Sequence, residues 1–338
     1  MRFRSFHWLV FFLIFASVPA LARAQGSIQI EQQVNALRRL FPEIGGGVRA
    51  VKSGPNGELL VLLPQKILLY DAKGAKIREM PAAPASRKTP PALMYGEAFD
   101  VDAAGKVYVA DRGAGMLRIF SVTGDLESSV PVESPTGVVL LPSGEVAVAS
   151  VSPTSLLTVF DMQGKVQRQF GDSLDLADTP ALNLFLNSGR LATDAAGNLY
   201  YAFTFAPEPT FRKYDRFGYA AYENSLKTLD FLGAAEAARK RIARRDNGDT
   251  VDLLQDVTAI GVDPQAQTAC IAVGDLLLLF DKDGNLRSQF RLYTPEDARL
   301  EINSILVLPD KLIVSSDTLG IYEFARLDGA AKPQKAAN

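Results

Sequence analysis

Short runs of alternating apolar and polar residues, separated by turn residues, recur along most of this chain. The clearest example lies within residues 95–131, where four such runs follow one another, at residues 98–101, 106–110, 117–121 and 126–130. Valine, tyrosine and isoleucine favour half-buried strands, whereas glycine and aspartate favour the tight turns between them. The pattern predicts a four-stranded antiparallel meander. One meander cannot bury both of its faces, so further copies are needed beside it.

The chain contains those copies. An aromatic residue, in most copies followed by aspartate, precedes a turn glycine at Gly74, Gly124, Gly164, Gly218, Gly284 and, more loosely, Gly329. An upstream turn glycine occurs in four copies, at Gly57, Gly105, Gly144 and Gly197, and residues 264–267 and 309–310 take its place in the last two. A period of about 40–50 residues with four strands per copy is typical of a β-propeller. Six copies predict an all-β, six-bladed β-propeller over residues 47–329.

Several of these segments resemble the NHL-repeat family of propellers. They are VDAAGKVYVADRGAGMLRIFSVTG from residue 101, TDAAGNLYYA from residue 193, VFDMQGK and LFDKDGN. The resemblance extends over about residues 48–329 and implies the propeller fold. Only Arg118 remains of the Asn-Asn-Arg that the family usually has before the third strand. The superfamily includes binding modules, scaffolds and enzymes, so the resemblance leaves the function open.

The two ends of the chain differ from the repeats. Residues 1–24 have a charged start, an apolar run and an Ala-Arg-Ala cleavage motif, which predict a signal peptide for periplasmic or secreted protein. An uncleaved membrane anchor is the alternative. The sequence has no second long apolar run, so membrane insertion of the mature chain is not predicted. Residues 330–338 are rich in lysine and alanine and predict a disordered tail.

Residues 25–46 are predicted to form an N-terminal helix and a linker. Ile30, Val34, Leu37 and Phe41 recur at spacings of four, three and four, which predicts an apolar helix face within residues 27–42. A strand at residues 27–30 that closes the last sheet is the alternative.

The predicted strand order assigns the turns to two faces of the propeller. The short glycine turns fall on one face, called here the turn face. The irregular segments fall on the opposite face, called here the loop face, and are residues 81–94, 133–136, 171–188, 203–210, 223–256 and 293–301. Variable loops on a rigid scaffold are where recognition usually occurs, so the loop face is the predicted binding surface.

The longest of these segments contains a predicted helical insertion at residues 227–250, between blades 4 and 5. Its alanine-rich stretch, residues 229–245, carries a basic cluster of Arg239, Lys240, Arg241, Arg244 and Arg245. A solvated helix face and a surface for an acidic ligand or partner are both consistent with this cluster.

The first polar residue of each innermost strand is predicted to line the channel mouth on the loop face. These candidate ligand-binding residues are Arg49, Glu97, Thr136, Arg190, Thr258 and Asn303. Two arginines with mixed polar groups suit a polar or anionic ligand. Simple solvation of the channel by these side chains is the alternative.

The composition excludes several kinds of chemistry. The only histidine, His7, lies in the predicted signal peptide, which excludes a Ser-His-Asp triad or a histidine metal ligand in the mature chain. The only cysteine, Cys270, lies in an apolar run and is predicted to be buried and inert. Without residues 1–24 the formal net charge is −5, which does not suggest a nucleic-acid surface.

We therefore expect a binding or scaffold module, without catalytic residues or a cofactor, that recognises a protein or a polar small molecule. A metal-dependent hydrolase of the gluconolactonase type is the alternative. In such enzymes a divalent cation sits in the channel mouth, and Glu97, Asn187, Asp256 and Asn303 would provide its oxygen ligands here. A resemblance to streptogramin lyases is disfavoured by the lack of histidine, and Asp111 is predicted to cap a turn.

Overall fold

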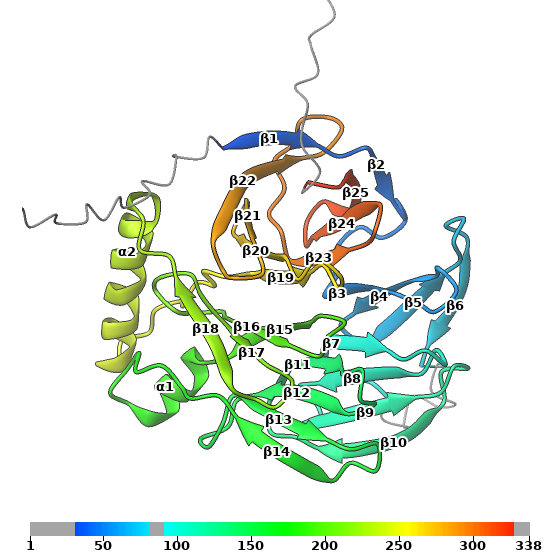
Figure 1. Ribbon diagram of the computed structural model, residues 1–338, viewed down its shortest axis with the longest axis horizontal. Helices are drawn as coiled ribbons and strands as arrows, with labels where there is room; N and C mark the ends of the chain where they lie inside the picture. The colour runs from blue at the N-terminus through cyan, green and yellow to red at the C-terminus, as the bar shows by residue number, and fades with distance from the viewer. Residues whose placement is uncertain (1–30, 82–90, 328–338) are drawn as a thin grey trace, which may run out of the picture.

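The computed structural model describes residues 31–81 and 91–327 and has six sheets around one axis (Figure 1). Blade 1 contains β3 (Ala50–Ser53), β4 (Leu59–Leu63), β5 (Lys66–Tyr70) and β6 (Lys76–Met80). Blade 2 contains β7 (Gly96–Val101), β8 (Val107–Asp111), β9 (Met116–Phe120) and β10 (Leu126–Pro131). Blade 3 contains β11 (Pro135–Leu140), β12 (Val146–Ser150), β13 (Leu157–Phe160) and β14 (Val166–Phe170). Blade 4 contains β15 (Gly189–Thr193), β16 (Leu199–Phe203), β17 (Thr210–Tyr214) and β18 (Ala220–Ser225).

Blade 5 contains β19 (Ala259–Val262), β20 (Ala269–Val273), β21 (Leu276–Phe280) and β22 (Leu286–Tyr293), and blade 6 contains β23 (Ser304–Val307), β24 (Lys311–Ser316) and β25 (Gly320–Ala325). The innermost strands contact one another in the cyclic order β3, β7, β11, β15, β19, β23 and back to β3. The prediction of an all-β, six-bladed propeller is confirmed.

The fourth strand of blade 6 comes from the N-terminal end of the chain. Strand β2 (Arg38–Leu40) pairs antiparallel with β25, and β1 (Gln32–Asn35) pairs parallel with the outer edge of β22 (Figure 1). The predicted sixth copy at Phe324 therefore provides no fourth strand, and its Gly329 lies outside the described residues. The ring is closed by joining the two ends of the propeller in one sheet.

The prediction of an N-terminal helix is wrong for the described part of residues 27–42. Phe41 is buried, as the apolar spacing required, but Leu37 of the same predicted face is 62% exposed, so no continuous helical face packs on the domain. The exposed edges of blades 5 and 6 offer backbone partners to this segment, and pairing with them satisfies its N–H and C=O groups. The alternative strand at residues 27–30 lies outside the described residues.

Two helices lie in the irregular segments of the loop face. Helix α2 (Leu229–Asp246) falls within the predicted insertion, whereas α1 (Pro180–Leu186) was predicted only as loop. Asp246, the last residue of α2, accepts hydrogen bonds from the backbone N–H groups of Asp178 (2.8 Å) and Thr179 (2.9 Å) at the start of α1. Neither helix in the described ranges is long and apolar enough to span a bilayer.

The repeated aromatic–Asp–Gly pattern has a local physical cause. In the turn after β5, Asp71 Oδ1 accepts the N–H groups of Lys73 (2.9 Å) and Ala75 (2.8 Å), while Gly74 has a φ of +86°. Glycine adopts this left-handed conformation without a steric cost. The preceding aromatic residues, Tyr70, Phe120, Phe160, Tyr214 and Phe280, are all buried within or between blades. Each copy therefore encodes a capped turn and a core residue together.

Candidate ligand site at the mouth of the central channel

A central channel with a cavity volume of about 950 Å³ runs between the six innermost strands. Its lining includes the beginning of these strands, on the loop face, and the hairpin turns on the turn face. Five of the six predicted mouth residues line this cavity: Arg49, Glu97, Thr136, Arg190 and Asn303. Thr258 is not part of the lining, and its hydroxyl donates to the Ile302 carbonyl at 2.5 Å.

Two of the mouth residues lie at irregularities in their strands. The pairing of β7 with β8 shifts register between Gly96 and Ala98, and that of β11 with β12 shifts between Pro135 and Gly137. Glu97 and Thr136 are the residues within these shifts. A β-bulge rotates a side chain away from the regular alternation of a strand, and bulges are common near binding sites. The sequence pattern carried no signal for either irregularity.

An ion pair crosses the mouth between blades that are not neighbours. Arg190 of blade 4 donates from an Nη atom to Glu97 Oε1 of blade 2 at 2.7 Å, and the two side chains are 19% and 8% exposed. Thr136 belongs to blade 3, which lies between these two blades in the ring. The pair neutralises both charges where water is restricted. Sequence reasoning placed both residues at the mouth without predicting that they pair.

A second ion pair lies further along the same strands. Lys52 Nζ of blade 1 is 3.2 Å from Asp100 Oδ1 of blade 2, and Asp100 Oδ2 accepts the Leu140 backbone N–H of blade 3 at 2.8 Å. Both charged residues line the channel. Neither residue is the first polar residue of its predicted strand, so this pair was not predicted from the sequence.

Arg49 differs from the other charged residues at the mouth. Its guanidinium carbon lies 4.9 Å from the centre of the Tyr95 ring, and no carboxylate in the described part of the chain lies within 4 Å of it. Three buried polar atoms at this mouth, Arg49 Nε, Arg190 Nε and Thr136 Oγ1, have no hydrogen-bond partner among the described residues. Buried polar groups are normally paired, so these atoms mark where a ligand or water would bind.

Close packing holds Arg190 in place. A Cβ on the preceding Gly189 would lie 2.6 Å from the Ala202 carbonyl oxygen and as close to the Tyr201 ring, so glycine is required. The Tyr201 hydroxyl donates to the Asn187 carbonyl at 2.5 Å. A fully buried aromatic residue thus fixes the turn that leads into β15.

The four residues of the metal-site alternative are not brought together. Glu97 and Asn303 line the channel, whereas Asn187 and Asp256 do not. The Asn187 side chain bonds the backbone of Leu174, and that of Asn303 bonds the Val48 carbonyl and the Ser315 hydroxyl. Across residues 31–81 and 91–327, no three His, Cys, Asp or Glu side chains form a group that could hold a metal ion.

Asp256 precedes β19 in the connection from α2. Burial raises the pKa of its carboxyl group to about 7, and the positive charge of Arg241 opposes this effect. Its backbone N–H donates to the Thr204 carbonyl at 2.8 Å. Asp256 is therefore a partly protonated group near neutral pH, at the junction of the helical insertion with blade 5.

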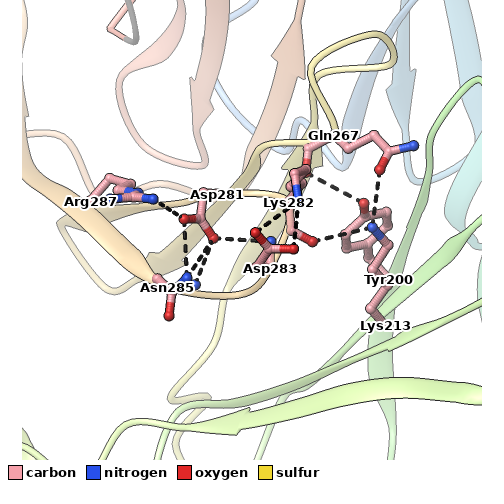
Figure 2. A network of polar contacts seen from close by, with 8 residues as sticks. All are labelled: Tyr200, Lys213, Gln267, Asp281, Lys282, Asp283, Asn285 and Arg287. Atoms are coloured by element: carbon pink, nitrogen blue, oxygen red, sulfur yellow. Dashed lines mark hydrogen bonds and ion pairs between the residues drawn. The ribbon is translucent and has the colours of Figure 1, made fainter.

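A second polar cluster lies between blades 4 and 5, outside the channel lining, and extends from the buried Tyr200 and Lys213 to the surface (Figure 2). Lys213 of β17 donates from Nζ to Gln267 Oε1 and to the Lys282 carbonyl, both at 3.3 Å. The same ammonium group lies 5.1 Å from the centre of the Tyr200 ring, and burial lowers the pKa of Lys213. Because these contacts join β17 to the hairpin turns of blade 5, we interpret the cluster as an interblade contact.

No protein-family model and no curated protein sequence matches this chain. Solved structures do resemble it. A structure of streptogramin B lyase has a TM-score of 0.55 with 12% identity, over 87% of this chain and 87% of that one. Virginiamycin B lyase from Staphylococcus aureus has a TM-score of 0.52 with 12% identity, over 86% and 87%. The structure of U3-55K has a TM-score of 0.52 with 8% identity, over 87% and 98%. At these identities the resemblance shows the propeller fold alone.

Proposed function

We propose that this protein is an exported, NHL-repeat-like propeller that binds a polar ligand or an envelope partner at the loop-face mouth of its channel. The observation that carries the proposal is the group of unpartnered buried atoms at that mouth, Arg49 Nε, Arg190 Nε and Thr136 Oγ1. A largely preformed concave site with a few converging polar groups is typical of ligand sites. The helices and irregular loops of the same face would extend the contact to a larger partner.

The enzyme alternatives receive less support. One similar structure is that of a catalytically inactive His→Ala variant of virginiamycin B lyase from Staphylococcus aureus with quinupristin. The only histidine of this chain, His7, lies in the predicted signal peptide, outside the described residues. In the hydrolase alternative Asn187 and Asn303 would be metal ligands, but their side-chain amides form hydrogen bonds with neighbouring protein groups. A binding module needs none of these catalytic groups.

Export is part of the proposal and has its own measurement. The Ala22-Arg23-Ala24 motif predicts a mature chain that begins at Gln25. Intact mass of the protein recovered from outside the cytoplasm should correspond to residues 25–338. Retention of residues 1–24 would contradict the proposed cleavage.

Crystals soaked with a library of small polar molecules, neutral, cationic and anionic, test the binding site. We expect bound molecules at the loop-face mouth, and loss of their binding in Arg49→Glu. Reversal of Arg190 alone would put two carboxylates together at Glu97, so the exchanged pair Arg190→Glu with Glu97→Arg is the better variant. Lys73→Glu in an exposed turn of the turn face is the control. Bound molecules only at other surfaces, or binding that Lys73→Glu removes and Arg49→Glu leaves intact, would overturn the proposed site.

A further inference from the structure

The charges that line the channel do not balance locally, and the imbalance lies at the loop-face mouth. Arg190 is paired with Glu97, and Lys52 is paired with Asp100. Arg49 has no carboxylate partner in the part of the chain that the structure describes. A partly desolvated guanidinium without a counter-ion favours an anion at its free edge, because charge interactions strengthen as water is excluded.

The turn-face end of the channel carries negative charge, in contrast to the unpaired positive charge at the loop-face mouth. Asp102 and Asp194 line it near the turn face. Their Oδ1 atoms accept backbone N–H groups of their own turns, from Ala104 and Ala196, each at 2.9 Å. These carboxylates repel an anion, so the channel has a direction: an anionic group is favoured at the loop face and disfavoured at the turn face.

Between the two ends, much of the channel wall is apolar. Ala98, Leu140, Leu191, Ile260 and Leu306 line the cavity and are all partly exposed. On an innermost strand, the exposed part of a side chain faces the channel. The cavity volume of about 950 Å³ is at the upper end of the range for small-molecule sites, roughly 300–1,000 Å³. The wall therefore suits the apolar part of a ligand.

We propose, building on the proposed function, that the ligand presents one carboxylate to Arg49 and extends an apolar body into the channel. The guanidinium carbon of Arg49 lies over the Tyr95 ring, and the planar fork of N–H donors on a guanidinium suits a two-point contact with a carboxylate. Thr136 Oγ1, unpartnered and buried at the same mouth, is a further donor. One uncompensated cation at a mouth whose other charges, those of Arg190 and Glu97, are paired favours a monoanion over a phosphate dianion.

The same chemistry has two sources, a free carboxylic acid and the carboxyl terminus of a peptide. Two matched pairs of probes distinguish them: hexanoate with hexanamide, and acetyl-Val-Leu with a free or an amidated C-terminus. Binding to the full mature chain is measured by calorimetry, and the position of each probe is found by crystal soaking.

We expect at least one acid to bind about tenfold more tightly than its amide, a typical effect of a charge-assisted two-point contact. Arg49→Gln should reduce this preference to less than about threefold, and Arg49→Lys should retain part of it. Glu97→Gln should increase the affinity for the acid, since it releases Arg190 from its ion pair. A merely structural role of Glu97 would not produce this gain. Lys73→Gln should leave every affinity unchanged.

The outcomes separate this inference from the proposed function. If acids and amides bind equally at the mouth and Arg49→Gln has no effect, the inference that the ligand presents a carboxylate to Arg49 is wrong. The proposed binding site at the mouth would still stand. If none of the four probes binds while neutral or cationic library molecules occupy the mouth, the carboxylate inference is likewise wrong and the binding site likewise stands. Failure of every molecule to enter the mouth would overturn the proposed function itself.

Discussion

Single residues fix the turns of this propeller and the connections between its blades. Asp111 is fully buried, and its Oδ1 accepts the backbone N–H groups of Tyr95 (2.9 Å) and Ala114 (3.2 Å). Its Oδ2 accepts the Nε–H of Arg118 at 2.7 Å. The turn role predicted for Asp111 agrees with these contacts, which also tie the connection from blade 1 to blade 2. An aspartate that looks chemically available in the sequence is here fully used by structure.

The turn glycines give a prediction at the same scale. Gly105 and Gly197 have φ values of +85° and +82°, where a β-branched residue is strained. Gly105→Val and Gly197→Val should each lower the free energy of unfolding by roughly 1–3 kcal/mol. Chemical denaturation measures the loss. Gly45→Val, at a position where an added Cβ would meet no atom beyond its chain neighbours within 4 Å, should change little. Unchanged stability of both turn variants would mean that the turns tolerate side chains.

Asp256 predicts a pH dependence of stability. Burial raises its pKa in the folded protein to about 7, well above the unfolded value near 3.8. Between these values the folded state binds more protons than the unfolded state, so this group makes stability fall as pH rises. Asp256→Asn removes the effect and should gain melting temperature relative to wild type at pH 8 but not at pH 4. Asp252→Asn, at an exposed position nearby, is the control. A difference that does not grow with pH would contradict the prediction.

At the scale of elements, α2 is more than a solvated insertion. Its buried residues include Phe231, which packs with the core between blades 4 and 5, and Ile242, which packs with Leu186 and Phe205. Three residues of its basic cluster pair with nearby carboxylates: Arg239 with Glu208, Lys240 with Glu236 and Arg244 with Asp249. One side of the helix thus belongs to the core, and much of the other side is neutralised locally.

Two adjacent residues of α2 test this packing. Phe231 is 8% exposed and Leu232 is 50% exposed. Phe231→Ala should lower the free energy of unfolding by about 3–5 kcal/mol, the usual cost of removing a buried aromatic ring. Leu232→Ala should cost about 0.5 kcal/mol or less. Equal effects of the two substitutions in urea denaturation would show that α2 does not pack through Phe231.

At the scale of the whole molecule, the ring is closed by the first residues that the structure describes. Strand β2 completes blade 6, and Arg38 of β2 forms an ion pair with Glu323 of β25 at 3.0 Å. Leu40 and Phe41 add buried apolar contacts with Ile321 and Val51. Because the two strands of this seam lie almost 300 residues apart in the sequence, closure depends on a non-local contact, and we expect it to be slow relative to the formation of single blades.

Removal of the closing strands tests this account. A chain that starts at Phe41 lacks β1 and β2 and leaves the edge of β25 open to self-association. We expect its melting temperature to fall by roughly 10 °C or more, or the protein to aggregate. A chain that starts at Gln25 keeps both strands and should melt like the full chain. Equal melting of the two truncated chains would show that the ring closes without β2.

The blades were predictable because their information is local. A buried aromatic residue, an aspartate and a left-handed glycine lie within about five residues of one another, so the turns at Gly74, Gly164 and Gly284 were legible in the sequence. The number of blades follows from counting such turns. The mouth residues were predictable in part, because a regular strand order places the first residue of every innermost strand at the same end.

Tertiary structure alone decided which distant groups meet. The Arg190–Glu97 pair depends on the arrangement of blades 2 to 4 and on a bulge at Glu97, and neither leaves a pattern in the sequence. The N-terminal segment is strand rather than helix because its backbone partners lie on β22 and β25, which its own sequence does not specify. Hydrogen bonds within a turn are set by neighbouring residues. Pairing across the ring is set by where the folded sheets bring edges and charges together. This is why only the tertiary structure showed that Arg49, at the channel mouth, has no carboxylate partner among the described residues.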